Sequence, residues 1–391
     1  MFYIGIDIAK TKHEASIIDS SGKSISKSIS FSNTLNGSSK FIDFLNSFNI
    51  DINNCIIGME ATGHYWLSLY SFLIGLDFEC IVINPIQSEA FRKMYIRQTK
   101  NDSVDSFVIA QILRFGEYSI SNFSDEDIFA LRNLSRYRFA LVDEASDWKR
   151  KLIAILDQVF PEYSRLFSNI YGVASKELLS KYPLPEDMIS IPTEQLANLL
   201  SKCSKGRFGI EKAHEIQNLA TNSFGIKFAQ RSFSFQIKQI INQISFLENQ
   251  ITEIEEEILI ILNELCPVIT TITGIGKVLG AAIYSEIGDI SRFEKPNQLV
   301  AYAGLDVTVK QSGDFNASKT KISKRGSPYL RRAIWLAETV AAFKDPALSK
   351  YYESLKSRGK SHGTALGAVS RKLTNIIFAV LRDNKPYIPN I

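Results

Sequence analysis

Phe2-Tyr3-Ile4-Gly5-Ile6-Asp7-Ile8-Ala9-Lys10 is a short apolar run that contains a single carboxylate. An apolar run of this length is typical of a strand buried in a sheet. A carboxylate buried there without a partner costs free energy, so it is usually compensated by a metal ion or a cationic side chain. Asp7 is therefore the first candidate functional residue, and its partners must come from elsewhere in the chain.

Three further carboxylates stand at the ends of predicted elements. Glu60 ends a second apolar run at residues 55–60, and Asp102 and Asp105 begin a segment whose apolar spacing is helical. Because these two aspartates are three residues apart, they can share one face of the first helical turn. Carboxylate oxygens suit Mg²⁺ or Mn²⁺, and two such ions about 4 Å apart promote phosphodiester cleavage. For each carboxylate taken alone, an ion pair or a helix cap remains the alternative.

The composition favours a soluble protein with real cores. The chain has 391 residues, enough for two or three domains, and 45% of them are hydrophobic. The net charge of +4 is too small to indicate nucleic-acid binding by itself. Four cysteines and four histidines are scattered without a Cys-x-x-Cys motif, so neither a zinc site nor a disulfide framework is expected. We expect a cytoplasmic protein with no membrane partner, because no signal peptide or long uninterrupted apolar span is present.

The N-terminal third has a mixed order of predicted elements. Residues 2–32 predict three strands, with a turn at 20–22, and the pattern then alternates between helix and strand. The later elements are a helix near 41–48, a strand ending at Glu60, a helix after Gly63, a strand at 79–83, and helices at 86–97 and 102–116. This β-β-β-α-β-α-β-α order is similar to that of the ribonuclease H-like fold. In that fold the first and fourth strands are neighbours, which would bring Asp7 beside Glu60 and place the helix that begins at Asp102 over them.

The middle of the chain is predicted to be helical. Residues 127–160 are rich in leucine, isoleucine and basic residues, and residues 165–225 predict short helices interrupted by prolines. A heptad repeat follows at Ile237, Ile244, Ile251, Ile258 and Leu265, interleaved with Ile240, Leu247, Ile254 and Ile261. This repeat predicts a coiled coil. Its partner is either the 127–160 helix or another protomer, and the sequence leaves both open.

Two features of the last third suit nucleic-acid phosphates. Gly274 and Gly276, followed by Lys277, form a Gly-x-Gly turn between helices that can present backbone N–H groups to an anion, although a plain tight turn is the alternative. Beyond it lies a basic patch with Asp314 as its only acid, formed by Lys310, Lys319, Lys321, Lys324, Arg325, Arg331 and Arg332. Such a patch suits a phosphate backbone, and a solvated lysine face is the alternative.

Ser312 lies among these cations and is followed by Gly313. A serine so placed can attack a phosphodiester and form a phosphoserine link that conserves the bond energy for rejoining. The residues alone support this role weakly, because loop serines are common and no neighbouring base is visible.

Taken together, these motifs resemble one family across most of the chain. They are, in order, Gly5–Lys10, Glu60–Gly63, Ile83–Pro85, Lys100–Asp105, Gly274–Gly276, Ala301–Leu305, Gln311–Gly313, Ile322–Gly326 and Leu330–Ala333. The chain is similar to the DEDD transposases, insertion-sequence recombinases with a RuvC-like N-terminal domain that are related to Piv-type DNA invertases. The resemblance leaves out residues 165–225.

The resemblance implies roles for particular residues. Asp7, Glu60, Asp102 and Asp105 correspond to a metal-binding tetrad for Mg²⁺ or Mn²⁺, and Ser312 corresponds to the catalytic serine. It implies a RuvC-like domain at 1–120, a helical coiled-coil region at 121–265 with a variable insert, and a mainly α transposase domain at 266–391.

The resemblance also implies partners. These are donor and target DNA, a structured non-coding guide RNA from the same element, and further copies of the chain. Such a homo-oligomer, a dimer or a tetramer, would form through the coiled coil and would build each site from two protomers. The protein would then act at the bacterial nucleoid.

Other functions fit parts of the pattern. An actin-like or Hsp70-like ATPase or a sugar kinase also has an early strand aspartate, but no glycine-rich phosphate loop follows Asp7. A metal-dependent nuclease of Holliday-junction type would use the tetrad without a serine linkage, and a site-specific DNA invertase would use both. A non-catalytic nucleic-acid-binding protein with a degenerate core is the last alternative. Covalent attachment of DNA to the protein separates the serine recombinases from the nuclease and the binding protein.

Overall fold

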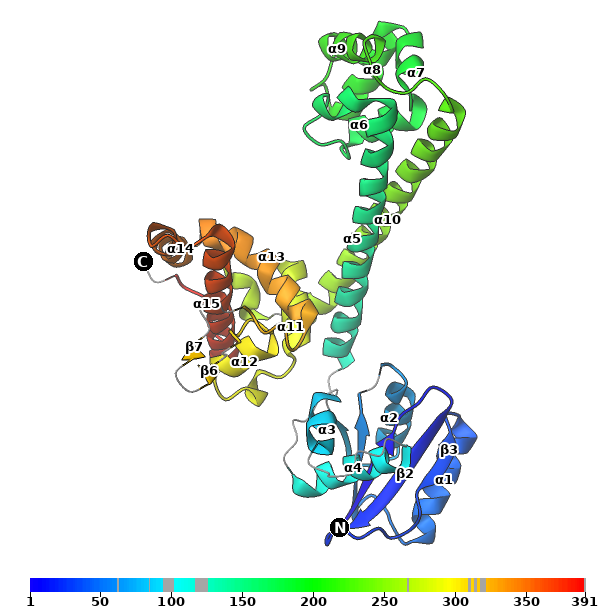
Figure 1. Cartoon of the computed structure of the whole chain (residues 1–391), viewed down its shortest axis with the longest axis vertical. Coiled ribbons are helices and arrows are strands. Elements are labelled where there is room, and N and C mark those ends of the chain that lie inside the picture. Colours follow the sequence, from blue (N-terminus) through cyan, green and yellow to red (C-terminus); the bar gives the residue numbers. More distant parts are fainter. Residues whose placement is uncertain are drawn as a thin grey trace. The chain divides into compact units, whose positions relative to one another are not determined.

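The computed structural model describes residues 1–61, 63–83, 85–93, 102–116, 126–265, 267–308, 311–312, 315–316 and 321–389. The chain divides into two compact units, residues 1–124 and 125–391. The first unit is α/β with a five-stranded sheet and the second is mainly helical, which confirms the predicted class of each part (Figure 1). Each unit is described by itself.

The sheet of the first unit has the strand order β3-β2-β1-β4-β5. Its strands are β1 Phe2–Asp7, β2 Lys12–Asp19, β3 Ile29–Ser32, β4 Cys55–Glu60 and β5 Cys80–Ile83. The first three strands form an antiparallel meander, whereas β1, β4 and β5 run parallel. The predicted adjacency of the first and fourth strands is confirmed. The third strand begins later than predicted, and Ser24 makes only an isolated bridge with Ile18.

Helices cover both faces of this sheet. They are α1 Leu35–Ser47, α2 Trp66–Ile74, α3 Pro85–Arg92 and α4 Asp102–Phe115. Ile4 and Ile6 of β1 share a buried core with Phe41 of α1 and Leu69 of α2. The residues that alternate with Ile4 and Ile6 along β1 point to the other face, which α4 covers; Tyr3, for example, packs with Ile109. Both faces of the sheet are thus buried, as expected for strands that are continuous apolar runs.

Gly5 allows α4 to lie directly on β1. A Cβ atom at this position would be 2.1 Å from the carbonyl oxygen of Ser106 and 2.3 Å from the backbone nitrogen of Ala110. Neither backbone atom can give way as a flexible side chain would, so only glycine fits beneath the helix. This close packing fixes the beginning of α4 near the carboxyl end of β1.

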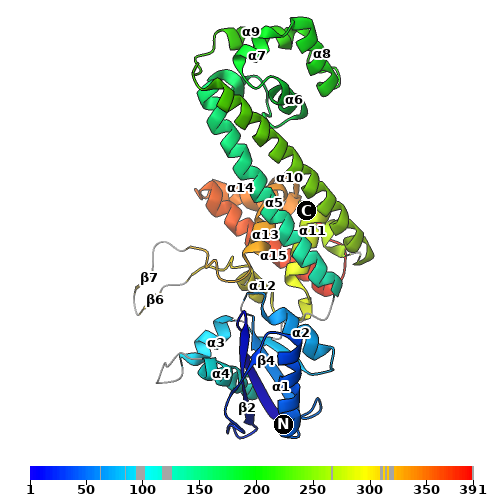
Figure 2. The ribbon, with the colours of Figure 1, turned by 90° about the vertical axis from the view of Figure 1, so that its right-hand side faces the viewer.

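The second unit is built on two long helices, α5 Glu126–Val159 and α10 Gln230–Leu265. They run antiparallel and side by side (Figures 1 and 2). Leu131 of α5 shares a core with Ile258 of α10, and further along the pair Leu141 packs with Leu247. The heptad positions of α10 are thus used within the chain, which is one of the two arrangements that the sequence left open.

Short helices connect α5 to α10, as predicted for residues 165–225. They are η1 Pro161–Arg165, α6 Val173–Lys181, α7 Pro185–Ser190, α8 Thr193–Ser204 and α9 Ile210–Thr221. Their apolar faces converge on Tyr163, Leu178 and Leu200, and this core continues into Ile237 and Ile241 of α10. This segment, residues 161–229, is hereafter called the helical insert.

The remaining elements form a helical C-terminal part. They are η2 Val268–Thr271, α11 Lys277–Ile287, η3 Ile290–Arg292, α12 Pro296–Tyr302, β6 Gln311–Ser312, β7 Phe315–Asn316, α13 Pro328–Lys344, α14 Pro346–Ser357 and α15 His362–Asp383. Among the described residues, α15 is the one helix long and apolar enough to cross a membrane. It packs in the core with Leu299, Ile334 and Leu348, so its apolar face already has partners.

Candidate active site

Two of the predicted carboxylates lie at the carboxyl ends of neighbouring parallel strands. Ile6 pairs with Met59, so Asp7 and Glu60, one residue further on, leave β1 and β4 at the same edge of the sheet. By the two-residue period of a strand, Asp7 shares a face with Gly5 and Glu60 shares a face with Gly58. Both glycines lie under α4. The two carboxylates therefore face the side of the sheet that α4 covers.

The other two predicted carboxylates begin α4. Asp102 and Asp105 both lie in its first turn, with Asp102 exposed and Asp105 only 8% exposed. Acidic residues are favoured at this end of a helix because of its partial positive charge. The neighbouring motif residues Lys100 and Asn101 lie outside the described part of the chain.

The pKa of Asp7 is raised by burial and by its interaction with the other three carboxylates. Burial raises it most, and the charges of Asp105, Asp102 and Glu60 raise it further, to about 6, whereas Arg92 acts in the opposite direction. Like charges disfavour the ionised form only when they are close. The structure thus brings all four predicted residues into one acidic cluster.

Two residues of α3 contact carboxylates of this cluster, and the sequence analysis missed both. Arg92 Nη2 lies 3.0 Å from Asp105 Oδ1, an ion pair that lacks the geometry of a hydrogen bond. Ser88 is buried, and its Oγ donates a hydrogen bond of 2.5 Å to Glu60 Oε2. The only sequence signal for these residues was the predicted helix around residues 86–97, which gives no direction for their side chains.

The chemistry of this cluster fits a divalent cation. Carboxylate oxygens are the ligands that Mg²⁺ and Mn²⁺ prefer, and burial and the neighbouring carboxylates both disfavour the ionised form of Asp7, which a bound cation would favour. Within the described residues, however, no three Asp, Glu, His or Cys side chains converge closely enough to hold one ion in this conformation. Arg92 and Ser88 now occupy oxygens that an ion would use.

Ser312 belongs to the second unit. It lies in β6 and pairs with Phe315 of β7, so its backbone forms part of a two-residue hairpin. The base of this hairpin is closed by Thr308, whose N–H donates to the carbonyl of Lys321 at 2.9 Å, and by Ser323, whose N–H donates to Asp306 at 2.8 Å. Gly313, Lys310 and Lys319 lie outside the described residues.

Some cations of the basic patch are exposed, and others form hydrogen bonds within the second unit. Lys321, Lys324 and Arg325 are exposed. By contrast, Arg331 Nη1 donates to the carbonyl of Ala303 at 3.2 Å. Arg332 is also engaged, because its guanidinium holds both carboxylate oxygens of Asp143 at 2.6 and 2.7 Å. These two arginines hold elements of the second unit together, which the sequence analysis did not foresee.

The Gly274–Lys277 turn is packed more tightly than predicted. Gly274 has a φ of +88°, and a Cβ atom there would lie 2.5 Å from the carbonyl oxygen of Ala337 in α13. Its glycine is therefore required by close packing on α13. Gly276 is the N-cap of α11 and has open space at its Cβ position. Lys277 is exposed and donates a hydrogen bond to Asn263 Oδ1 at 3.2 Å.

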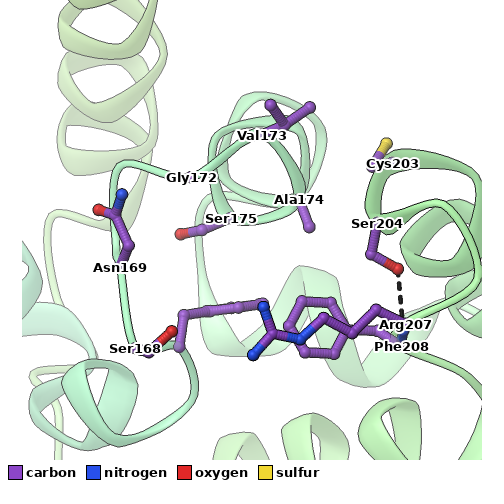
Figure 3. Close-up of a pocket in the computed structure, with 11 residues that line it drawn as sticks. Ser168, Asn169, Gly172, Val173, Ala174, Ser175, Cys203, Ser204, Arg207 and Phe208 are labelled. Carbon is purple, nitrogen blue, oxygen red and sulfur yellow. Dashed lines mark hydrogen bonds between the residues drawn. The ribbon is translucent and has the colours of Figure 1, made fainter.

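A pocket of about 190 Å³ lies elsewhere in the second unit, within the helical insert (Figure 3). It is lined by the start of α6, the end of α8 and the loops beside them. Ser204 Oγ accepts a hydrogen bond of 2.8 Å from the N–H of Phe208 at its rim. Arg207 is the one cation among the described lining residues, and no carboxylate is among them. This pocket lacks the acidic groups of the cluster around Asp7.

Comparison with known proteins gives the family. Residues 4–161 match a family model described as a transposase, and residues 266–353 match one for the IS116/IS110/IS902 transposase family. The chain is a member of the IS110-type transposase family. The acidic cluster lies within the first match, and the hairpin that carries Ser312 lies within the second.

Relatives of this transposase include a gene-inverting protein and insertion-element proteins. The pilin gene-inverting protein of Moraxella bovis is 26% identical over 386 residues, which cover 98% of this chain and 97% of the relative. The insertion element IS110 43.6 kDa protein of Streptomyces coelicolor is 24% identical over 299 residues, 75% of this chain and 73% of that protein. The IS110-type transposase described here is therefore an enzyme that acts on DNA.

Proposed function

We propose that this transposase cleaves and rejoins DNA strands through a serine-linked intermediate, with divalent cations held by Asp7, Glu60, Asp102 and Asp105. The observation that carries the proposal is the placement of Asp7 and Glu60 at one edge of the sheet together with Asp102 and Asp105 in the first turn of α4, where burial and then the charges of the other three carboxylates raise the pKa of Asp7 to about 6. The strand order 3-2-1-4-5, with β1 and β4 parallel, supports a ribonuclease H-like, RuvC-like fold for this unit.

The acidic residues have distinct expected roles. Asp7 and Glu60 project from rigid strand ends, so they would fix the position of an ion relative to the sheet. Asp102 and Asp105 would complete its coordination, and Arg92 would have to release Asp105 as the ion binds. When bound, Mg²⁺ or Mn²⁺ neutralises the scissile phosphate and favours the departure of the leaving oxygen.

Ser312 is the proposed nucleophile. Its Oγ would bond to the scissile phosphorus as one P–O bond to deoxyribose breaks. The serine proton passes to solvent, and the released deoxyribose oxygen takes up a proton. Attack by a new strand end would reverse these steps and free the serine. The exposed Lys321, Lys324 and Arg325 would hold phosphates near the hairpin.

The proposed partners are those that the family resemblance implies. The proposed enzyme works at donor and target DNA in the bacterial nucleoid, is guided by a structured non-coding RNA, and forms an oligomer that combines an acidic cluster with a serine from another copy. Because the core of the α5–α10 pair is satisfied within one chain, such an oligomer needs surfaces other than the buried heptad positions.

Covalent trapping tests the serine linkage. The protein is mixed with DNA ends of its element, RNA transcribed beside its gene and Mg²⁺, then denatured and examined for protein-linked DNA. We expect an adduct that disappears in Ser312→Ala while DNA binding persists, and that also disappears in Asp7→Asn. Cleaved DNA without an adduct would support the second candidate, a metal-dependent junction nuclease, and would leave Ser312 without a catalytic role.

Site-specific inversion is a closely related candidate. It is favoured by the match to the pilin gene-inverting protein over nearly the whole length of both chains. Substrates with two sites in inverted orientation distinguish it, because an invertase would reverse the intervening segment and an insertion-sequence transposase would release or insert it.

A further inference from the structure

The outer surface of the α5–α10 pair carries an aromatic and basic groove next to the helical insert. Its volume is about 410 Å³, and it is lined by Trp148, Lys151, Ala154 and Ile155 of α5 and by Phe235, Gln236, Gln239 and Ile240 of α10. A second hollow of about 700 Å³ adjoins it and is lined in part by Arg231 and Lys238. Phe235 and Gln236 belong to both hollows.

Phe235 stands at the centre of this surface and is 64% exposed. An aromatic ring left in water does not help folding, whereas the neighbouring Ile237 and Ile240 on the same helix are buried. Phe246, three turns further along α10, lies close to the same line of the helix and is 56% exposed. The surface thus presents two aromatic rings, Phe235 and Phe246, that are largely exposed and do not belong to the core.

The charges beside these rings are positive. Lys151 Nζ lies 3.9 Å from the centre of the Trp148 ring, and Arg231 and Lys238 flank Phe235 from the other side. None of the described residues that line the two hollows is a carboxylate. From residue 226 to residue 247 the sequence has three cations and no acid. The nearby Glu248 is held by Lys149 and Lys176, so it does not offset the charge.

We propose that this groove binds a single-stranded nucleic-acid segment, with a base stacked on the exposed ring of Phe235 and phosphates held by Lys151, Arg231 and Lys238. Every base has a flat face, so aromatic rings among cations bind single strands with little dependence on sequence. A second copy of the chain fits less well, because a two-fold interface would place these cations against themselves. None of the described lining residues of the two hollows belongs to the acidic cluster or to the hairpin of Ser312.

The direct test is binding of fluorescently labelled oligo-U, oligo-dT and a blunt DNA duplex to the full chain, followed by anisotropy at several salt concentrations. We expect Phe235→Ala to weaken binding of the single strands by about tenfold, the effect of losing one stacked base, and to leave duplex binding nearly unchanged. Tyr137→Ala, an aromatic residue 52% exposed on α5 and outside the groove, is the matched control. Comparison of oligo-U with oligo-dT tells whether RNA or DNA is preferred.

A charge variant tests the phosphate contacts independently. The double substitution Lys151→Gln and Lys238→Gln should lower the slope of log affinity against log salt by about 1.4, or about 0.7 for each lost contact with a single strand. Equal behaviour of Phe235→Ala and Tyr137→Ala, with an unchanged salt slope in the double variant, would overturn the proposal. A shift in oligomeric state on Phe235→Ala, with normal single-strand binding, would instead identify an interface between copies. The result is distinguishable from failure of the proposed function, because Ser312→Ala abolishes the covalent adduct without affecting this groove.

Discussion

Arg136 of α5 holds both carboxylate oxygens of Glu286 in α11, with Nε 2.5 Å from Oε1 and Nη2 3.1 Å from Oε2. Glu286 is only 2% exposed, and its Oε2 also accepts a hydrogen bond of 2.7 Å from Ser327, the N-cap of α13. This ion pair therefore joins the long helix α5 to α11 and to the start of α13.

Breaking this pair should destabilise the second unit strongly. Arg136→Met removes the hydrogen-bonded cation of the buried Glu286, but Arg136 is itself 42% exposed and Arg132 still interacts with Glu286, so we expect a loss of about 1.5–3 kcal/mol in the free energy of unfolding. The control is Arg150→Ala, which removes the exposed ion pair with Asp147 and should change stability by less than about 1 kcal/mol. Urea unfolding followed by circular dichroism measures both. Similar small losses for the two variants would show that the Arg136–Glu286 pair is not structural.

The acidic cluster should be under electrostatic strain without metal. Because the pKa of Asp7 is raised from 3.8 to about 6, its ionisation opposes folding increasingly as the pH rises from about 4 to about 6. Asp7→Asn should therefore stabilise the metal-free protein at pH 7.5, by about 1–2 kcal/mol after allowance for solvent screening, and have no effect at pH 3.5.

Mg²⁺ should stabilise the native chain but not the Asp7→Asn variant. It should raise the melting temperature of the native chain and have little effect on Asp7→Asn, because an ion that binds only the folded state stabilises it. Asp43→Asn, at an exposed position of α1, is the control for charge removal alone. An equal Mg²⁺ response in all three proteins would exclude Asp7 as a ligand.

The close packing of α4 on Gly5 predicts that the added methyl group of Gly5→Ala lowers the stability of the first unit strongly. Gly5→Ala would place a Cβ atom 2.1 Å from the Ser106 carbonyl oxygen, so α4 must shift and stability should fall by about 3 kcal/mol or more. Gly367→Ala in α15 is the matched control, because nothing lies within 4 Å of its Cβ position. Alanine in that helix should stabilise by about 0.5–1 kcal/mol. Thermal unfolding compares the two, and a tolerated Gly5→Ala would contradict the close packing of α4 on β1.

Glu338 should make the stability of the second unit depend on pH. This carboxyl is fully buried between α13 and α15, accepts a hydrogen bond from Ser370, and burial raises its pKa to about 7. The folded state then keeps a proton that the unfolded state loses above about pH 4.5, so stability decreases as the pH rises from about 4.5 to about 7. Glu338→Gln should gain about 1–2 kcal/mol at pH 8 and nothing at pH 4. The exposed Glu353→Gln should show no such difference, and a pH-independent effect of Glu338→Gln would contradict the assignment.

Much of the first unit could be predicted because its signals are local. The apolar runs that end at Asp7 and Glu60 have the length and continuous apolar character of buried strands, and the pair Asp102 and Asp105 begins a run with helical period. Their convergence depended on pairing of β1 with β4, which the order of elements suggested through a known fold and the register of the strands bears out.

The other features of the fold and of the candidate site depend on contacts between residues of different elements, which the sequence pattern does not reveal. Arg92 forms an ion pair with Asp105, and Arg332 forms one with Asp143. The members of each pair belong to different helices, so the sequence shows that the charges exist but not which of them meet. Gly274 was predicted as an anion-binding turn because glycine is equally suited to a turn and to close packing, and only the position of α13 distinguishes the two uses. Ser312 was a candidate mainly through family resemblance, since no partner base is visible beside it in the sequence.

The helical insert leaves and rejoins the long helices at one place. The chain departs from α5 after Val159, and on its return the N–H of Ile226 donates to the carbonyl of Gln158 at 2.9 Å. The two ends of this excursion are thus hydrogen-bonded to each other before α10 begins. Topologically the insert is a side branch, so its length can change between related proteins, or by design, without altering the register of α5 against α10. A reporter domain or an affinity module could therefore be inserted there without changing the elements that carry the acidic cluster and Ser312.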